Sequence, residues 1–331
     1  MIGYRTFSSR SLFWTAIKLL ISLACLFALW RWIDPSRLSS DLKGMIAIPF
    51  AIAVALNLIL QVFNAIKIRL LFPAPRPALA GMVTVNFIAV FFSTFIPGGI
   101  GGEVARWAYL GRESGSKSRA LAAILLDRIT GLWAQTFLAV AAWLWLERNS
   151  LTLKVAVPGA LLVLGGSMGA GIWGYRGLTR VLSKLGVWYA RKRGEEGAGP
   201  EDISAALADL LASRGHLLQV VGLSLANHAV VVATFLFIDR SIGGNLGLAQ
   251  ALVFLFGYTA ILLLPVTFGN WGLSEGILGI FYHYAGAQSS TGVLISLLLR
   301  AMNLPAAALG WIFFLTRRSK EARLDHPAAM G

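Results

Sequence analysis

Eight apolar segments dominate the sequence, and each has close to the roughly 20 residues that an α-helix needs to cross a bilayer. They are 12–33, 45–66, 78–96, 120–146, 154–174, 216–238, 248–266 and 289–316. Only 13% of the 331 residues are charged and 57% are hydrophobic, which is too apolar for a soluble globule of this length. We therefore predict an all-α polytopic membrane protein with a single transmembrane domain, 1–331.

The net charge of +14 fits a membrane protein better than a nucleic-acid-binding protein. Excess Lys and Arg residues of multi-pass proteins gather in cytoplasmic loops and against anionic headgroups, and the sequence shows no soluble nucleic-acid-binding module. Cys25 is the only cysteine, so we expect neither an internal disulfide nor a cysteine-based metal site. The four histidines have no metal-ligand spacing, and we expect no metal and no cofactor.

The distribution of Lys and Arg tests how the segments thread the membrane. If all eight segments spanned it from a cytoplasmic N-terminus, the loops 97–119 and 175–214 would place eleven of these residues outside, against the positive-inside rule. If 78–112 and 248–285 each turn back instead, 21 of the Lys and Arg residues lie on the cytoplasmic side and six lie outside. The remaining two lie within apolar segments. We therefore expect six spanning helices, two re-entrant helix hairpins and cytoplasmic termini.

Each predicted hairpin contains residues that break a helix. These are Pro97, Gly98, Gly99, Gly101 and Gly102 in the first hairpin, and Pro265, Gly269 and Gly272 in the second. Non-helical backbone at membrane depth is tolerated only where it is buried in protein or lines a wet cavity, so two breaks imply a cavity. The glycines of the first break fit close helix packing, or alternatively an anion cradle at a helix start.

The two breaks belong to an internal repeat. When Glu103 is aligned with Glu275, Arg128 falls on Arg300, so the spacing from Glu to Arg is the same in both halves. The charge distribution gives the two halves opposite orientations. Inverted repeats whose broken helices meet near the membrane midplane are typical of secondary transporters.

The halves of this predicted inverted repeat cover about 45–146 and 216–316, joined by a cytoplasmic linker, 175–214. Within the linker, 178–193 has apolar residues at helical spacing with basic residues between them. That pattern suits an amphipathic helix on the inner membrane surface, and it suits an ordinary connector helix equally well.

Charged and polar side chains within or beside the apolar segments are the candidate substrate-binding residues. They are Arg128, Arg300, Glu275, Glu103, Asp127, Arg106 and Asn303. Arg128 lies about eight residues into its segment, which is roughly 12 Å along a helix. Arg300 lies nearer the middle of its segment. A charge at such a depth should face a cavity or a partner.

Each candidate also has a structural alternative. Arg128 could reach the cytoplasmic headgroups or pair with the aspartate beside it. Glu103 could cap its short helix or pair with Arg106 at i+3. Glu275 has no basic residue within one turn, so we expect it to pair with Arg128 or Arg300 across the interface between the halves.

A family resemblance rests on two stretches. "FIPGGIGGEVARWAYLGRESGSKSRALAAILLDRITG" (95–131) resembles the first signature of the lysylphosphatidylglycerol synthase transmembrane-domain family, also called flippase-like domain proteins. The matching features are the Pro-Gly-Gly-x-Gly-Gly break, Arg106, and Asp127-Arg128-x-x-Gly. "FGNWGLSEG" (268–276) resembles the second signature, a Gly-rich break followed by Glu, although Asn and Trp stand where the family often has small residues.

The resemblance implies a lipid translocase of a bacterial inner membrane. The best-understood members move aminoacylated phosphatidylglycerol between leaflets and carry a cytosolic transferase domain. This chain ends about fifteen residues after its last apolar segment, so we expect no synthase domain and no enzymatic activity. Arg128 and Arg300 would bind the phosphate of an anionic lipid. Glu103 and Glu275 would hold the arginines or bind a cationic part of the headgroup.

Two other functions fit parts of the sequence. A membrane enzyme acting on lipid-linked substrates would use Glu and Asp near a cavity, although the sequence lacks an Asp-x-Asp metal motif. A non-transporting subunit of a biosynthetic complex would need neither arginine. The partners expected are membrane lipids and lipid-biosynthesis proteins. The sequence contains no ATP-binding motif, so transport would be passive or coupled to an ion.

Overall fold

The computed structural model of the protein describes residues 40–72, 76–95, 100–146, 214–262 and 267–325, with isolated residues between 19 and 31 and residue 205. The predictions that lie outside the described residues concern the segment 154–174, the helix 178–193, Pro97, Gly98, Gly99 and Pro265. The first apolar segment, 12–33, is described only at isolated positions.

The described ranges contain helices and no strands, which confirms the all-α prediction. The α-helices are α3 (Ala47–Leu70), α4 (Leu79–Phe95), α5 (Ile100–Ser114), α6 (Lys117–Leu146), α10 (Arg214–Ser241), α11 (Leu248–Leu262), α12 (Leu273–Tyr284), α13 (Ser289–Ala301) and α14 (Leu304–Asp325). A short 3₁₀ turn, η1 (Phe268–Asn270), separates α11 from α12.

Within the described residues, four helical stretches are long and apolar enough to cross a membrane. They are Ala47–Leu70, Lys117–Leu146, Leu218–Ser241 and Ser289–Arg317. The helices α4 and α11 are apolar but shorter. Several long apolar helices in one chain make this a multi-pass membrane protein.

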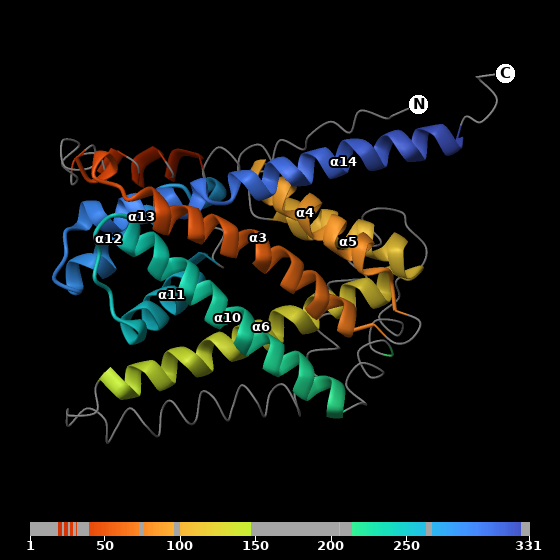
Figure 1. Ribbon diagram of the computed structural model, residues 1–331, viewed down its shortest axis with the longest axis horizontal. Coiled ribbons are helices and arrows are strands. Elements are labelled where there is room, and N and C mark those ends of the chain that lie inside the picture. Colours follow the sequence, from red (N-terminus) through yellow and green to blue (C-terminus); the bar gives the residue numbers. More distant parts are fainter. Residues whose placement is uncertain are drawn as a thin grey trace.

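The helices α4 and α5 pack against each other as an antiparallel pair (Figure 1). Near the break between them, Gly102 lies directly against Ser93, so even a methyl group at position 102 would overlap the Ser93 hydroxyl. At the other end, Gly81 faces the carboxylate of Glu113. The chain therefore reverses direction at the first break.

The helices α11 and α12 form a second pair in which the Phe254 ring stacks on Phe281 with centroids 5.1 Å apart. The turn between them uses left-handed backbone at three positions: Gly269 (φ 62°), Asn270 (φ 59°) and Gly272 (φ 82°). Asn tolerates this conformation better than most residues with a side chain. Asn270, which departs from the family pattern, therefore suits the turn.

The last predicted segment, 289–316, is two helices rather than one. Pro305 has no N–H to donate to the carbonyl of residue 301, so it interrupts the helical ladder there. The chain turns through Met302 and Asn303 between α13 and α14. This junction places Asn303 one turn after Arg300.

Helix α3 connects two buried apolar clusters and packs along α10 (Figure 1). Its first half contributes Ala53 to a cluster with residues of α10, α11, α12 and α13. Its second half contributes Ala65 and Ile68 to a cluster with residues of α4, α5 and α6. The polar side chains on α3 therefore lie between the two parts of the molecule.

Gly292→Ala should destabilise the protein by about 1–3 kcal/mol, because the added methyl group would overlap the backbone of α12 at Leu278 and Gly279. The measurement is thermal unfolding in detergent. The matched control is Gly222→Ala in α10, where nothing lies within 4 Å of the added carbon. That substitution should be neutral or raise stability by up to about 1 kcal/mol. Equal losses in both variants would contradict the close approach of α12 and α13.

Candidate functional site

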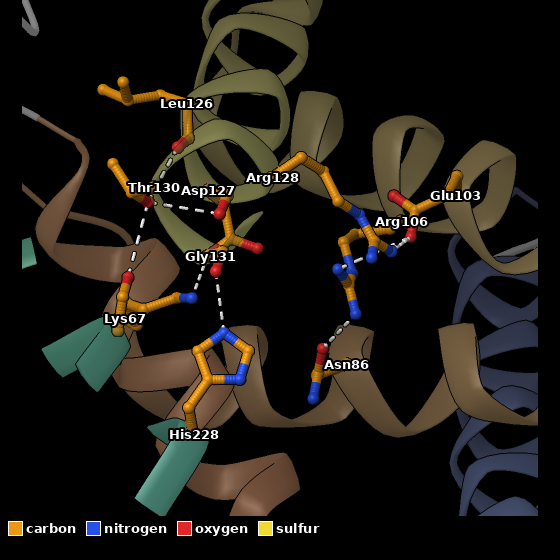
Figure 2. A network of polar contacts seen from close by, with 11 residues as sticks. Lys67, Asn86, Glu103, Arg106, Leu126, Asp127, Arg128, Thr130, Gly131 and His228 are labelled. Carbon is orange, nitrogen blue, oxygen red and sulfur yellow. Dashed lines mark hydrogen bonds and ion pairs between the residues drawn. The ribbon is translucent and has the colours of Figure 1, made fainter. Parts of the chain in front are cut away.

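Two arginines converge on one carboxylate at the start of α5. Arg128 of α6 donates from Nη2 to Oε1 of Glu103, and Nη1 of Arg106 lies 3.8 Å from the same oxygen. Nη2 of Arg106 also donates to Oδ1 of Asn86 on α4, at 2.7 Å (Figure 2). The cluster Glu103–Arg106–Arg128 therefore carries one formal positive charge in excess.

The side chain of Arg128 is 55% exposed, and Glu103 is its only protein partner among the described residues. Oε2 of Glu103 and Nε of Arg106 are buried, and neither has a hydrogen-bond partner among those residues. A guanidinium group has five N–H donors that match a phosphate or carboxylate group. The cluster thus retains both the charge and the free donors to bind an anion.

Asp127, the neighbour of Arg128, has its ion-pair partner on α3. Its Oδ1 lies 2.8 Å from Nζ of Lys67 on α3, and both side chains are buried (Figure 2). Nε2 of His228 lies 2.8 Å from the carbonyl oxygen of Gly131, one turn further along α6. Asp127 therefore takes part in a buried contact between α6 and α3 rather than in a local pair with Arg128.

The second Glu–Arg pair has a different environment. Nε of Arg300 donates to Oε1 of Glu275 at 2.9 Å, and the Glu275 side chain is only 2% exposed. The other Glu275 oxygen accepts the backbone N–H of Gly272 at 2.7 Å, which caps the start of α12. Ser296 of α13 donates to the first oxygen at 3.3 Å.

The remaining donors of Arg300 are directed at the second break. Nη1 donates to the carbonyl of Gly269 at 3.3 Å, and Nη2 donates to the carbonyl of Asn270 at 3.1 Å and to the hydroxyl of Ser274 at 2.7 Å. The guanidinium also lies 4.1 Å from the centre of the Trp271 ring. Arg300 thus satisfies carbonyl groups that the left-handed backbone leaves without helical partners.

The Glu and Arg residues that share the same sequence spacing in the two halves also contact each other. Glu103 contacts Arg128, and Glu275 contacts Arg300. Each glutamate pairs within its own half. For Glu275, the prediction named Arg300 as one of two partners, but it placed the contact across the interface between the halves. The structure places it between α12 and α13.

Sequence reasoning missed three buried amide side chains that lie between Arg106 and Asn303. Asn57 and Gln61 of α3 and Asn86 of α4 are buried and hydrogen-bonded to one another. Asn303, a predicted site residue, accepts from Asn57 Nδ2 at 3.1 Å. A signal existed, because Asn57, Gln61 and Asn64 recur at i, i+4 and i+7 in an otherwise apolar segment.

The described residues contain no group of three or more His, Cys, Asp and Glu side chains arranged to hold a metal ion. The charged groups of the two sites are instead arranged as opposite-charge pairs. The excess positive charge lies on the first cluster.

The chain was compared with known proteins in three ways. Residues 15–310 match the protein-family model described as the Lysylphosphatidylglycerol synthase TM region. A search of curated proteins and a search of solved structures each found no match. The matched range covers most of the chain and contains both Glu–Arg pairs, which confirms the family that the two signatures predicted. The chain therefore belongs to the lysylphosphatidylglycerol synthase TM region family.

Proposed function

We propose that this protein is a lipid translocase, which moves an anionic phospholipid or lipid-linked headgroup between leaflets without catalysing a reaction. The observation that carries the proposal is the excess positive charge of Glu103, Arg106 and Arg128, together with the exposure of Arg128. A charged group within an apolar segment is costly unless it serves a partner or a passing substrate. A phosphate group would neutralise the cluster and accept the donors that remain.

The two arginines of the repeat have different roles in this proposal. Arg128 binds the headgroup phosphate, with Arg106 beside it. Arg300, whose donors are engaged by Glu275 and the second break, holds that break in shape. Glu103 keeps the two arginines of the first cluster together while the site is empty.

The proposed topology has six spanning helices and two re-entrant hairpins, α4–α5 and α11–α12, in an inverted repeat. Nη2 of Arg317 lies 2.7 Å from Oε1 of Glu113, so the end of the last apolar segment and the end of α5 share one side of the molecule. Ile46 donates its N–H to the Ser241 carbonyl at 2.6 Å, so the start of α3 and the end of α10 also share a side. Both contacts fit the threading of this topology. The cytoplasmic position of the termini, in a bacterial inner membrane, is proposed from the distribution of Lys and Arg.

In this proposal the direct partners are the membrane lipids themselves. Proteins that make the transported lipid are further expected partners, because a translocase acts on their product. Transport is passive or coupled to an ion. The proposed activity needs no bound cofactor, because it forms and breaks no covalent bond.

The test is lipid scrambling by the purified protein in proteoliposomes. A fluorescent anionic phospholipid is placed in both leaflets, and a membrane-impermeant reductant then bleaches the outer one. We expect bleaching to pass well beyond half of the signal with the protein and to stop near half in protein-free vesicles. Bleaching that stops at half for every anionic lipid tested would overturn the proposed function.

A further inference from the structure

A continuous row of hydrogen-bonded side chains joins the first cluster to the junction after Arg300. Its steps are Arg106 to Asn86 at 2.7 Å, Asn86 to Gln61 at 2.9 Å, Gln61 to Asn57 at 3.4 Å and Asn57 to Asn303 at 3.1 Å. We call Asn86, Gln61, Asn57 and Asn303 the amide path. It passes through α4 and α3 and ends between α13 and α14.

Most of the amide path lies in the buried parts of α3 and α4, where apolar side chains are expected. Asn57, Gln61 and Asn86 are buried, and they lie on helices whose other buried side chains are mostly apolar. Buried polar groups inside a membrane protein are costly unless they are hydrogen-bonded, and amide side chains there commonly join neighbouring helices. One pair of amides would be enough to brace two helices, whereas this row continues from one half of the protein to the other.

Amide side chains suit brief contacts with a moving headgroup better than tight binding of it at one place. Each amide offers both donors and acceptors, so it can exchange a bond with a neighbouring amide for a bond with a phosphate oxygen, a hydroxyl or an amine. An amide carries no charge and does not hold an anion as firmly as an arginine does. Conduction requires sites that bind well enough for entry and weakly enough for release.

We infer that the amide path is the route along which the headgroup crosses between the Arg106–Arg128 site and the Arg300 junction. The inference rests on the proposed function and adds Asn57, Gln61 and Asn86 to the residues that contact the substrate. The substrate class is a phosphate-bearing headgroup whose other polar groups, such as hydroxyls or an amine, use the amides in turn.

Gln135 supplies a matched control for this inference. It is a buried glutamine on a spanning helix, and it donates to the Leu255 carbonyl at 3.0 Å and to the Thr259 hydroxyl at 2.9 Å. These two bonds join α6 to α11 and include no member of the amide path. Gln61 and Gln135 therefore have the same chemistry and similar burial, but only Gln61 lies on the route.

The first experiment measures access to water without measuring transport. Cys25→Ser removes the single native cysteine, and Gln61→Cys or Gln135→Cys is then added. Proteoliposomes are treated with an anionic or a cationic membrane-impermeant methanethiosulfonate. We expect Gln61→Cys to be labelled, with the anionic reagent faster by about tenfold because the route attracts anions. Gln135→Cys should stay unlabelled. Equal labelling of the two variants would contradict the inference.

The second experiment compares scrambling by Gln61→Leu and Gln135→Leu, after both are shown to be monodisperse and equally stable to heat. Gln61→Leu should slow transport of the anionic lipid about tenfold, the loss expected for one hydrogen bond to a charged group. Gln135→Leu should transport at nearly the wild-type rate. If wild type scrambles and both variants match it, the amide path is wrong and the proposed function stands. If wild type does not scramble, the proposed function itself is wrong.

Discussion

Arg300→Gln should destabilise the protein by about 3–5 kcal/mol, because it leaves the carboxylate of Glu275 buried without a positive partner. The Glu275 side chain is 2% exposed, and the substitution also removes the donors to the carbonyls of Gly269 and Asn270. The double variant Glu275→Gln with Arg300→Gln should lose less than the single variant, since no unpaired charge remains. The measurement is unfolding in detergent, followed by heat or by denaturant.

The matched control is the same substitution in the other half of the repeat. Arg128 is more than half exposed, and its pair with Glu103 should contribute at most about 1 kcal/mol. Arg128→Gln should therefore unfold close to wild type. Equal destabilisation by the two substitutions would contradict the different roles assigned to the two arginines.

Arg128→Gln should instead lower the rate of anionic lipid transport by roughly 10- to 100-fold, the effect of losing a hydrogen bond between charged groups. The fold should stay intact, so the loss would be in binding the phosphate. Initial scrambling rates in proteoliposomes measure it. Arg119→Gln, on the same helix and exposed near its start, is the control and should transport like wild type. A normal rate in Arg128→Gln would remove this arginine from the site.

The sequence explains why the two halves differ at equal spacing. When the two Glu–Arg pairs are aligned, Ser274 corresponds to Gly102 and Trp271 to Gly99. Arg300 donates to the Ser274 hydroxyl and lies over the Trp271 ring. Glycine has neither a hydroxyl nor a ring, so the first half cannot supply Arg128 with these two contacts. The difference in side chains thus leaves Arg128 available for an anion.

Features encoded locally could be predicted from the sequence. The apolar segments predicted the described spanning helices, and the shared spacing from Glu to Arg marked these four residues as repeated positions. It did not predict that each Glu contacts the Arg of its own half. The turn at the second break follows from residues that accept left-handed backbone, Gly269 and Gly272 among them. These features depend on residues that are close in sequence or on a pattern that repeats along the chain. They can therefore be recognised without knowing which helices are neighbours.

Features that depend on helix packing could not be predicted in the same way. The partner of Asp127 is Lys67 of α3, which lies three helices earlier in the chain. The row from Gln61 to Asn86 depends on α3 lying beside α4. Helical spacing gives the face on which a side chain lies, but only the packed structure shows what that face contacts.

The most direct test of the central claim, that the first cluster recognises an anionic headgroup during transport, is a comparison of two lipids. Scrambling of fluorescent phosphatidylglycerol and of fluorescent phosphatidylcholine is measured in the same vesicles, with wild type and with Arg128→Gln. We predict that wild type moves the anionic lipid faster and that Arg128→Gln loses this preference. Equal rates for the two lipids in wild type, or an unchanged preference in the variant, would contradict the claim.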